Sequence, residues 1–188
     1  VDFAAAEVYK HYQPAVEIVA DVGASLRELN KELAQTSCRF DSSWYIPIRD
    51  RIRGDIKSYA LKDGEPFHVP GVLNILRSLM GDEDLLISDV GSHKIWIARN
   101  FPARTPNCCL IYNGLASMGF ALPGAIAASL LDPHRRIVAC MGDGGFLMNS
   151  QELETAKRLG VVFTVIIFND NDYGLISWKQ QMTRGRST

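Results

Sequence analysis

Apolar residues in the first third of the chain predict two helices and a short strand. The β-branched run at 16–19 has the length of a strand, and apolar residues then recur at three- and four-residue spacing through 22–33, as on one face of a helix. A second amphipathic helix is predicted across 42–60. The turn-rich stretch 62–66 follows it, and we expect a domain boundary there.

From residue 67 onward, apolar strands alternate with amphipathic helices. Strands are predicted at 84–90, 136–141 and 161–168, and helices from Pro70, at 117–131, at 149–159 and from 174 through Trp178. The helix at 149–159 carries two end signals: Asn149 and Glu152 as a capping box, and Gly160 as its C-terminal stop.

This alternation predicts an α/β fold, with a mostly parallel sheet and helices on both faces. Ligands of such sheets bind at the carboxyl ends of the strands. Three polar turns are expected at that edge, at 89–93, 142–145 and 169–174.

Composition and charge narrow the function classes. With 20 basic and 21 acidic residues the net charge is −1, which lacks the basic field that nucleic-acid binding requires. No apolar run reaches the ~18 residues of a membrane span. Cys38, Cys108, Cys109 and Cys140 form no Cys-x-x-Cys pair, so we expect neither a zinc site nor a disulfide scaffold but a reducing, cytoplasmic setting. Because the sequence starts at Val1 without an initiator methionine, we expect a piece of a longer protein.

Two of the polar turns have the residues that a magnesium-bound diphosphate needs. Asp143 lies at a strand end beside Gly144 and Gly145, and Asp170 follows the next strand. Magnesium prefers carboxylate and phosphate oxygens, while glycine-rich turns let backbone N–H groups approach phosphate closely. Each turn alone is also explained as an ordinary polar turn. Together, one βαβ unit apart, they predict a shared site.

The spacing of these turns resembles a family signature. Gly142-Asp143-Gly144, 24 intervening residues and then Asn169-Asp170 are similar to the metal motif of thiamine diphosphate enzymes. Within that superfamily the segments 89–93, 113–123 and 142–148 resemble the acetolactate synthase (acetohydroxyacid synthase) large subunit group.

The resemblance implies a domain division as well as a fold. Residues 67–188 would be the thiamine diphosphate-binding domain, incomplete at its C-terminus. Residues 1–36 would close a middle domain, with 37–66 as the connecting helix and linker.

The resemblance also implies the ligands of the cofactor and of the metal. Asp143, the side chain of Asp170 and the backbone carbonyl of Asp172 would hold Mg²⁺. Gly144 and Gly145 would donate N–H groups to the diphosphate of thiamine diphosphate. Further cofactor-binding positions implied by the matched motifs are Val90, Gly91, Ser92, His93, Gly142, Tyr173 and Gly174.

The catalytic end of the cofactor is implied in the same way. Met118 would be the apolar wedge that keeps the cofactor bent, and Ala116 would offer its carbonyl to the pyrimidine amino group. Met148 and Trp178 would line the substrate pocket. Biosynthetic members carry a tryptophan that favours 2-ketobutyrate, and the aligned residue here is Lys179, so we expect no such preference.

The activity implied is the condensation of two molecules of pyruvate to acetolactate with loss of CO₂. The activating glutamate would come from a pyrimidine-binding domain of the same or a partner subunit, in a homo-oligomer, so the isolated chain is expected to be inactive. The sequence does not decide whether the parent protein also binds FAD. The alternatives are a pyruvate oxidase, a 2-keto acid decarboxylase or a non-catalytic phosphate-binding module. A dinucleotide-binding domain is disfavoured because no Gly-x-Gly-x-x-Gly opens a helix after a strand.

Overall fold

The computed structural model describes residues 14–37, 41 and 43–187, and divides the chain into two compact units, Val1–Arg49 and Asp50–Thr188. In the first unit the predicted helix is confirmed as α1 (Val22–Gln35), whose N-cap Asp21 accepts a 2.7 Å hydrogen bond from the Ala24 amide. The predicted strand at 16–19 is not formed, because only Val19 makes an isolated β-bridge there. An extended strand also needs a covered face, yet Val16 is 76% exposed.

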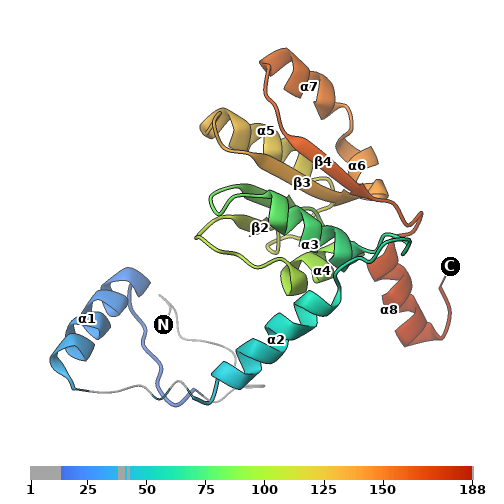
Figure 1. Ribbon diagram of the computed structural model, residues 1–188. Coiled ribbons are helices and arrows are strands. Elements are labelled where there is room, and N and C mark those ends of the chain that lie inside the picture. The colour runs from blue at the N-terminus through green and yellow to red at the C-terminus, as the bar shows by residue number, and fades with distance from the viewer. Residues whose placement is uncertain (1–13, 38–40, 42, 188) are drawn as a thin grey trace. The chain divides into compact units, whose positions relative to one another are not determined.

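The larger unit is built on a four-stranded, all-parallel sheet (Figure 1). Its strands are β1 (Leu85–Ser88), β2 (Cys109–Ile111), β3 (Ile137–Gly142) and β4 (Thr164–Phe168), in the spatial order β2-β1-β3-β4. The predicted α/β class is therefore confirmed. The chain leaves β1 toward one side of the sheet and β3 toward the other, which makes the gap between β1 and β3 the topological switch point.

Two of the described helices, α2 (Ile46–Ser58) and α3 (Val69–Leu79), precede β1. The others connect the strands or follow the last one: α4 (Ser92–Asn100), α5 (Ala121–Leu131), α6 (Asp143–Asn149), α7 (Glu152–Leu159) and α8 (Gly174–Arg184). None of the helices in this described part is both long and apolar enough to cross a membrane.

The core has two layers because residues of the central strands alternate between the two faces of the sheet. On one face, Leu86 and Val138 pack with residues of α3 and α4 such as Leu76 and Ile97. On the other face, Ile87 and its neighbours pack with the small-residue helix α5. Helices on both faces were predicted, and this arrangement confirms them.

Several element boundaries differ from the sequence prediction. Residues 142–145 are not a turn but lead directly into α6. The predicted capping box is wrong, because α7 begins after Gln151 and the Asn149 side chain bonds elsewhere. The stop at Gly160 is confirmed, with φ +67°. The short helix expected through Trp178 continues to Arg184.

Three elements were not predicted at all. They are α4, which begins directly at the turn after β1, the strand β2, which has three residues, and α6, which begins directly after β3. The described part of the larger unit thus has one more strand and two more helices than the apolar pattern indicated.

Candidate functional site

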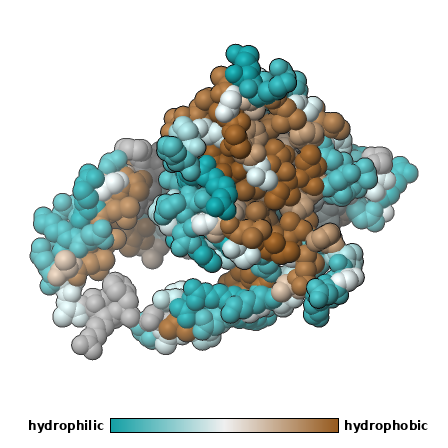
Figure 2. All heavy atoms as spheres, turned by 45° about the horizontal axis from the view of Figure 1, so that its top comes forward, coloured by the Kyte–Doolittle hydropathy of each residue, from teal (hydrophilic) through white to brown (hydrophobic). Residues whose placement is uncertain are grey.

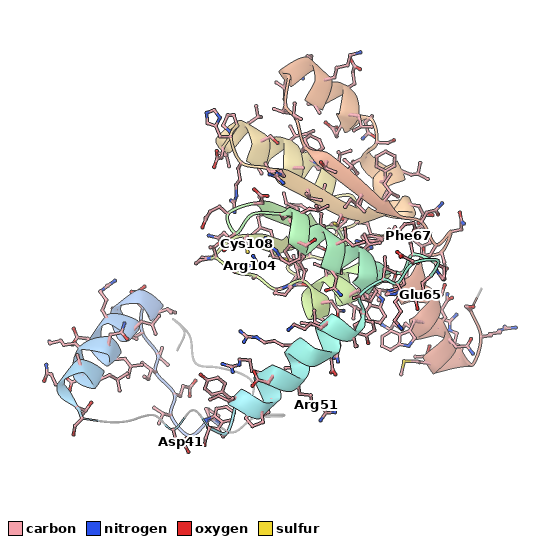
Figure 3. All side chains as sticks on the ribbon, viewed as in Figure 1. Asp41, Arg51, Glu65, Phe67, Arg104 and Cys108 are labelled. Carbon is pink, nitrogen blue, oxygen red and sulfur yellow. The ribbon has the colours of Figure 1, made fainter. Side chains whose placement is uncertain are left out.

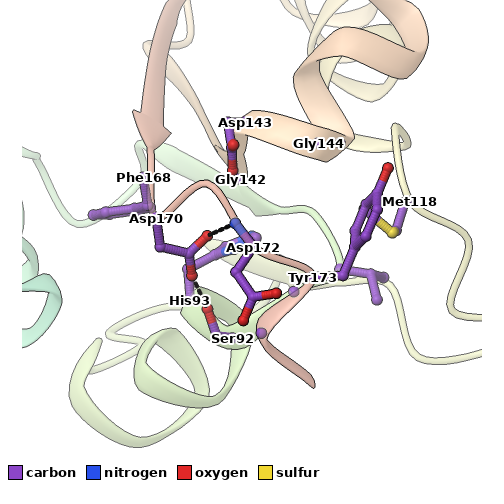
Figure 4. Close-up of a pocket in the computed structure, with 14 residues that line it drawn as sticks. Ser92, His93, Met118, Gly142, Asp143, Gly144, Phe168, Asp170, Asp172 and Tyr173 are labelled. Atoms are coloured by element: carbon purple, nitrogen blue, oxygen red, sulfur yellow. Dashed lines mark hydrogen bonds between the residues drawn. The ribbon is translucent and has the colours of Figure 1, made fainter. Parts of the chain in front are cut away.

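The three segments predicted as polar turns, 89–93, 142–145 and 169–174, meet in one pocket at the carboxyl ends of β1, β3 and β4, beside the switch point (Figure 4). The pocket is lined by Val90, Gly91, Ser92, His93, Met118, Gly142, Asp143, Gly144, Gly145, Phe168, Asp170, Asp172, Tyr173 and Gly174. All but one of these residues were expected from the sequence to lie at the site. The exception is Phe168, the last residue of β4.

The turn after β4 is ordered by its own carboxylates. Asp170 accepts a hydrogen bond from the Ser92 hydroxyl (3.2 Å) and another from the Asp172 backbone amide (3.3 Å). The intervening Asn171 has φ +55°, a left-handed conformation that asparagine adopts more readily than most residues. Asp172 in turn accepts a 2.5 Å hydrogen bond from the Ser177 hydroxyl in α8.

Two carboxylates of the pocket could bind a metal ion, and they come from different strand ends: Asp143 follows β3, and Asp170 follows β4. Among the described residues, no group of three His, Cys, Asp or Glu side chains is arranged to hold a metal ion. A cation here would need backbone carbonyl, phosphate or water oxygens to complete its shell. That mixed set is the one that magnesium commonly takes.

Neighbouring side chains closely approach two glycines at the start of α6. A Cβ on Gly145 would lie 2.2 Å from Oδ2 of Asp89, and a Cβ on Gly144 would lie 2.8 Å from Cε1 of Tyr173. At these two positions the α6 backbone carries no side chain of its own. A phosphate group can approach such a backbone closely.

His93 is buried beside the pocket, with 2% of its surface exposed. Its ring stacks on Phe168 at a centroid distance of 5.9 Å, and its Nε2 atom has no hydrogen-bond partner. Burial lowers the pKa of His93, although the carboxylates of Asp89 and Asp170 act in the opposite direction. The ring is therefore neutral near pH 7, with one unsatisfied polar atom that a ligand could pair.

Asp89 is a buried polar residue that sequence reasoning missed. Its carboxylate is fully buried and accepts hydrogen bonds from the backbone amides of Gly119 (2.9 Å) and Phe120 (3.1 Å). The carbonyl of Gly119 also accepts a 2.8 Å bond from the Asn149 side chain. The only sequence signal was an aspartate directly after a buried strand, which does not reveal its partners.

Three predicted residues lie outside the pocket lining. Ala116 is in the loop before α5 with φ +52°, a conformation unusual for a residue with a Cβ. Met148 in α6 and Trp178 in α8 are 46% and 59% exposed. Their roles stay predictions.

The family described as "Thiamine pyrophosphate enzyme, C-terminal TPP binding domain" matches residues 89–188, which include the whole pocket. The chain is 30% identical to the acetolactate synthase of Bacillus subtilis, over 97% of this chain and 32% of that protein. It is 31% identical to the acetolactate synthase isozyme 1 large subunit of Escherichia coli (97% and 32%) and 32% identical to the catabolic acetolactate synthase of Raoultella terrigena (96% and 33%). The chain thus spans about a third of the length of these curated relatives. The chain belongs to the thiamine pyrophosphate enzymes and includes their C-terminal cofactor-binding domain.

Proposed function

We propose that the full-length protein condenses two molecules of pyruvate to acetolactate with loss of CO₂, using thiamine diphosphate and Mg²⁺. This chain would supply the site for the diphosphate and the metal. The observation that carries the proposal is that Asp143 and Asp170, from two strand ends, line one pocket with Gly144 and Gly145. The similarity to acetolactate synthases supports the choice of reaction.

For the metal we assign the side chains of Asp143 and Asp170 and the backbone carbonyl of Asp172. Two carboxylates and a carbonyl give three hard oxygens, and the diphosphate and water would complete the octahedron that Mg²⁺ prefers. Ser92 donates to one oxygen of Asp170, which fixes the orientation of that carboxylate. Such outer contacts commonly set the direction of a metal ligand.

For the diphosphate we assign the N–H groups of Gly144 and Gly145, with Ser92 and His93 on the opposite side. The unpartnered Nε2 of His93 is a buried polar atom that a phosphate oxygen would satisfy. The glycines fit because neither carries a Cβ that would keep a phosphate group away from the backbone. Phe168 holds the imidazole by stacking.

When bound, thiamine diphosphate supplies an electron sink for the carbon that loses CO₂, while the protein binds and orients it. Met118 would press against the middle of the cofactor, and the carbonyl of Ala116 would bind the pyrimidine amino group. Met148 and Trp178 would bound the substrate. Lys179 aligns with the tryptophan that favours 2-ketobutyrate, so we propose pyruvate as both substrates.

We further propose that a pyrimidine-binding domain, from the same or a partner subunit of a homo-oligomer, covers the larger unit. Figure 2 shows a broad apolar area on one face of the molecule. Several large apolar side chains of this unit are mostly exposed, such as Leu115 (87%), Leu147 (71%) and Phe67 (84%). Figure 3 places Phe67 at the end of the unit opposite Arg104 and Cys108, and Phe67 lines an apolar hollow beside β4. Exposed apolar surface of this kind usually marks a contact with further protein.

The test is product analysis with the full-length protein, given pyruvate, Mg²⁺ and thiamine diphosphate. Acetolactate is the expected product. Acetaldehyde, acetyl phosphate or acetate would place the protein among the decarboxylases or oxidases and overturn the proposed reaction. Asp143→Ala should abolish Mg²⁺-dependent cofactor binding, measured by calorimetry, because it removes one of two carboxylate ligands. Unchanged binding by this variant would contradict the assignment of the metal site.

The isolated 188-residue chain should release no CO₂ from pyruvate under the same conditions. The reason is that the activating carboxylate is proposed to come from a different domain. Turnover by the pure chain would disprove this division of roles.

A further inference from the structure

The peptide groups that follow Met118 are held from two sides by buried or half-buried side chains of other elements. Asp89, at the end of β1, accepts the amide of Gly119 on Oδ2 (2.9 Å) and the amide of Phe120 on Oδ1 (3.1 Å). Asn149, at the end of α6, donates its Nδ2 to the carbonyl of Gly119 (2.8 Å). Two successive peptide groups are therefore fixed by three hydrogen bonds.

This arrangement is tightly packed as well as hydrogen-bonded. Asp89 is fully buried, and a carboxylate is costly to bury unless its oxygens are satisfied. A Cβ on Gly119, which has φ +83°, would lie 2.6 Å from Nδ2 of Asn149. A Cβ on Gly145 would lie 2.2 Å from Asp89. Only glycine fits at both points, so the loop, β1 and α6 hold one another in a single register.

Met118 directly precedes these fixed peptide groups, and its side chain lines the pocket. Its Cε atom lies 3.5 Å from the place where a Cβ on Gly144 would stand. The Met118 side chain thus closes against the glycine backbone at the start of α6. Its position depends on the next peptide group, which Asp89 holds.

We propose that Asp89 and Asn149 are positioning residues that hold the Met118 side chain in the position where it contacts the cofactor. The proposal rests on the proposed function, because it assumes that Met118 contacts the cofactor. We call the three hydrogen bonds from Asp89 and Asn149 to the peptide groups after Met118 the clamp. The proposal predicts that loosening this clamp affects the reacting end of the cofactor more than the diphosphate end. The assigned diphosphate ligands, which lie at the starts of α4 and α6, take part in none of these three hydrogen bonds.

The experiment uses the full-length protein and the variant Asp89→Asn, which keeps the size of the side chain. An amide has one acceptor oxygen, so one backbone N–H would face an NH₂ group instead. We expect kcat for CO₂ release from pyruvate to fall by about 10–100-fold, the range for misplacement of a group by about 1 Å. The dissociation constant of Mg²⁺–thiamine diphosphate should stay within about twofold.

A matched control is Asp84→Asn. Asp84 precedes β1, at the end of the strand opposite Asp89. Its side chain also accepts a hydrogen bond from a backbone amide, that of Gly81 (2.8 Å), and forms an ion pair with Arg136 (3.4 Å). This variant should lower the melting temperature but leave kcat unchanged. If it lowers kcat as much as Asp89→Asn does, the effect is general destabilisation and the proposal is wrong.

A double-mutant cycle tests whether Asp89 acts through Met118. In the Met118→Ala background, Asp89→Asn should change kcat by no more than about twofold, because the side chain being positioned is gone. A full additional loss in that background would overturn the proposal. If Asp89→Asn does not fold, Asn149→Ala replaces it in the same cycle, since Asn149 is only half-buried.

Failure of the proposed reaction is distinguishable from failure of this inference. CO₂ release is followed whichever product forms, so a product other than acetolactate leaves the cycle intact. Hydrogen exchange of the full-length protein without cofactor gives an independent measurement. The amides of Gly119 and Phe120 should be protected in the natural protein and in Asp84→Asn, and should lose protection in Asp89→Asn. Fast exchange in the natural protein would refute the clamp itself.

Discussion

Replacing Gly145 by alanine tests the packing at the centre of the site. Helix propensity alone predicts a gain, because alanine is more favourable than glycine inside a helix by at most about 1 kcal/mol. The structure predicts the opposite. The new Cβ would lie 2.2 Å from Oδ2 of Asp89, whereas real Cβ contacts are not closer than 3.0 Å. The carboxylate would have to retreat by at least 0.8 Å.

A retreat of that size is enough to break the 2.9 Å hydrogen bond from Gly119 to the same oxygen. A lost hydrogen bond to a buried charged group costs about 1.5–3 kcal/mol. After the propensity gain is subtracted, the variant should be destabilised by about 0.5–2 kcal/mol, and by more if the bond from Phe120 is also lost. The two contributions thus differ in sign, and the steric one is larger.

Gly144→Ala is the matched control in the same helix. Its Cβ would meet Cε1 of Tyr173 at 2.8 Å, but that side chain is 51% exposed and can rotate away. Urea denaturation followed by circular dichroism should show a lower midpoint for Gly145→Ala and a nearly unchanged one for Gly144→Ala, with equal slopes. Adding Asp89→Ala to Gly145→Ala should cost less than the sum of the single changes. Equal midpoints for the two glycine variants would refute the steric argument.

Two further predictions concern pH. Burial lowers the pKa of His93 below its ordinary 6.5, so the folded state favours the neutral ring. The neutral His93 ring therefore contributes to stability above pH 6.5. This contribution is lost as pH falls toward the folded pKa, because the unfolded chain then binds more protons than the folded one. His93→Gln should flatten the acid side of a plot of urea midpoint against pH, and parallel curves would contradict this. Burial raises the pKa of Cys140 from 9.0 to about 12, so stability should fall between those values by up to about 1.4 kcal/mol per pH unit. Cys140→Ala should make that alkaline slope shallower, leaving the part due to Cys109, whose pKa burial raises to about 11. An unchanged slope would show that the Cys140 thiol ionises equally in both states.

Elements with a strong periodic pattern could be predicted from the sequence, and weakly patterned ones could not. β3 and β4 are apolar runs bounded by turns, and both were found, as was α3 with its proline in the first turn. α4 was missed because it buries only His93, Ile97 and Asn100, a mixed polar and apolar set. β2 has three residues and becomes a strand only through its pairing with β1. Its structure depends on a neighbour that local pattern cannot reveal.

The candidate site shows the same division. Asp143 and Asp170 stand in polar segments whose residue types and spacing are visible along the chain, and both line the pocket. Asn149 was read as a helix cap, because asparagine followed three residues later by glutamate is a cap signal. In the structure its amide bonds to Gly119, 30 residues away in the sequence. A tertiary contact replaced the local one.

The strand order explains why the residues that sequence reasoning missed lie at the centre of the site. Because the chain leaves β1 and β3 in opposite directions, a crevice opens between their carboxyl ends, and the loop before α5 must cross it to reach the other face of the sheet. A crossing loop has no strand neighbours to pair its backbone. Asp89 from one strand end and Asn149 from the helix after the other supply those partners across 30 residues of sequence. The ligand-binding groups can therefore be read locally, whereas the groups that hold the crossing loop follow from topology and appear only when the sheet is assembled.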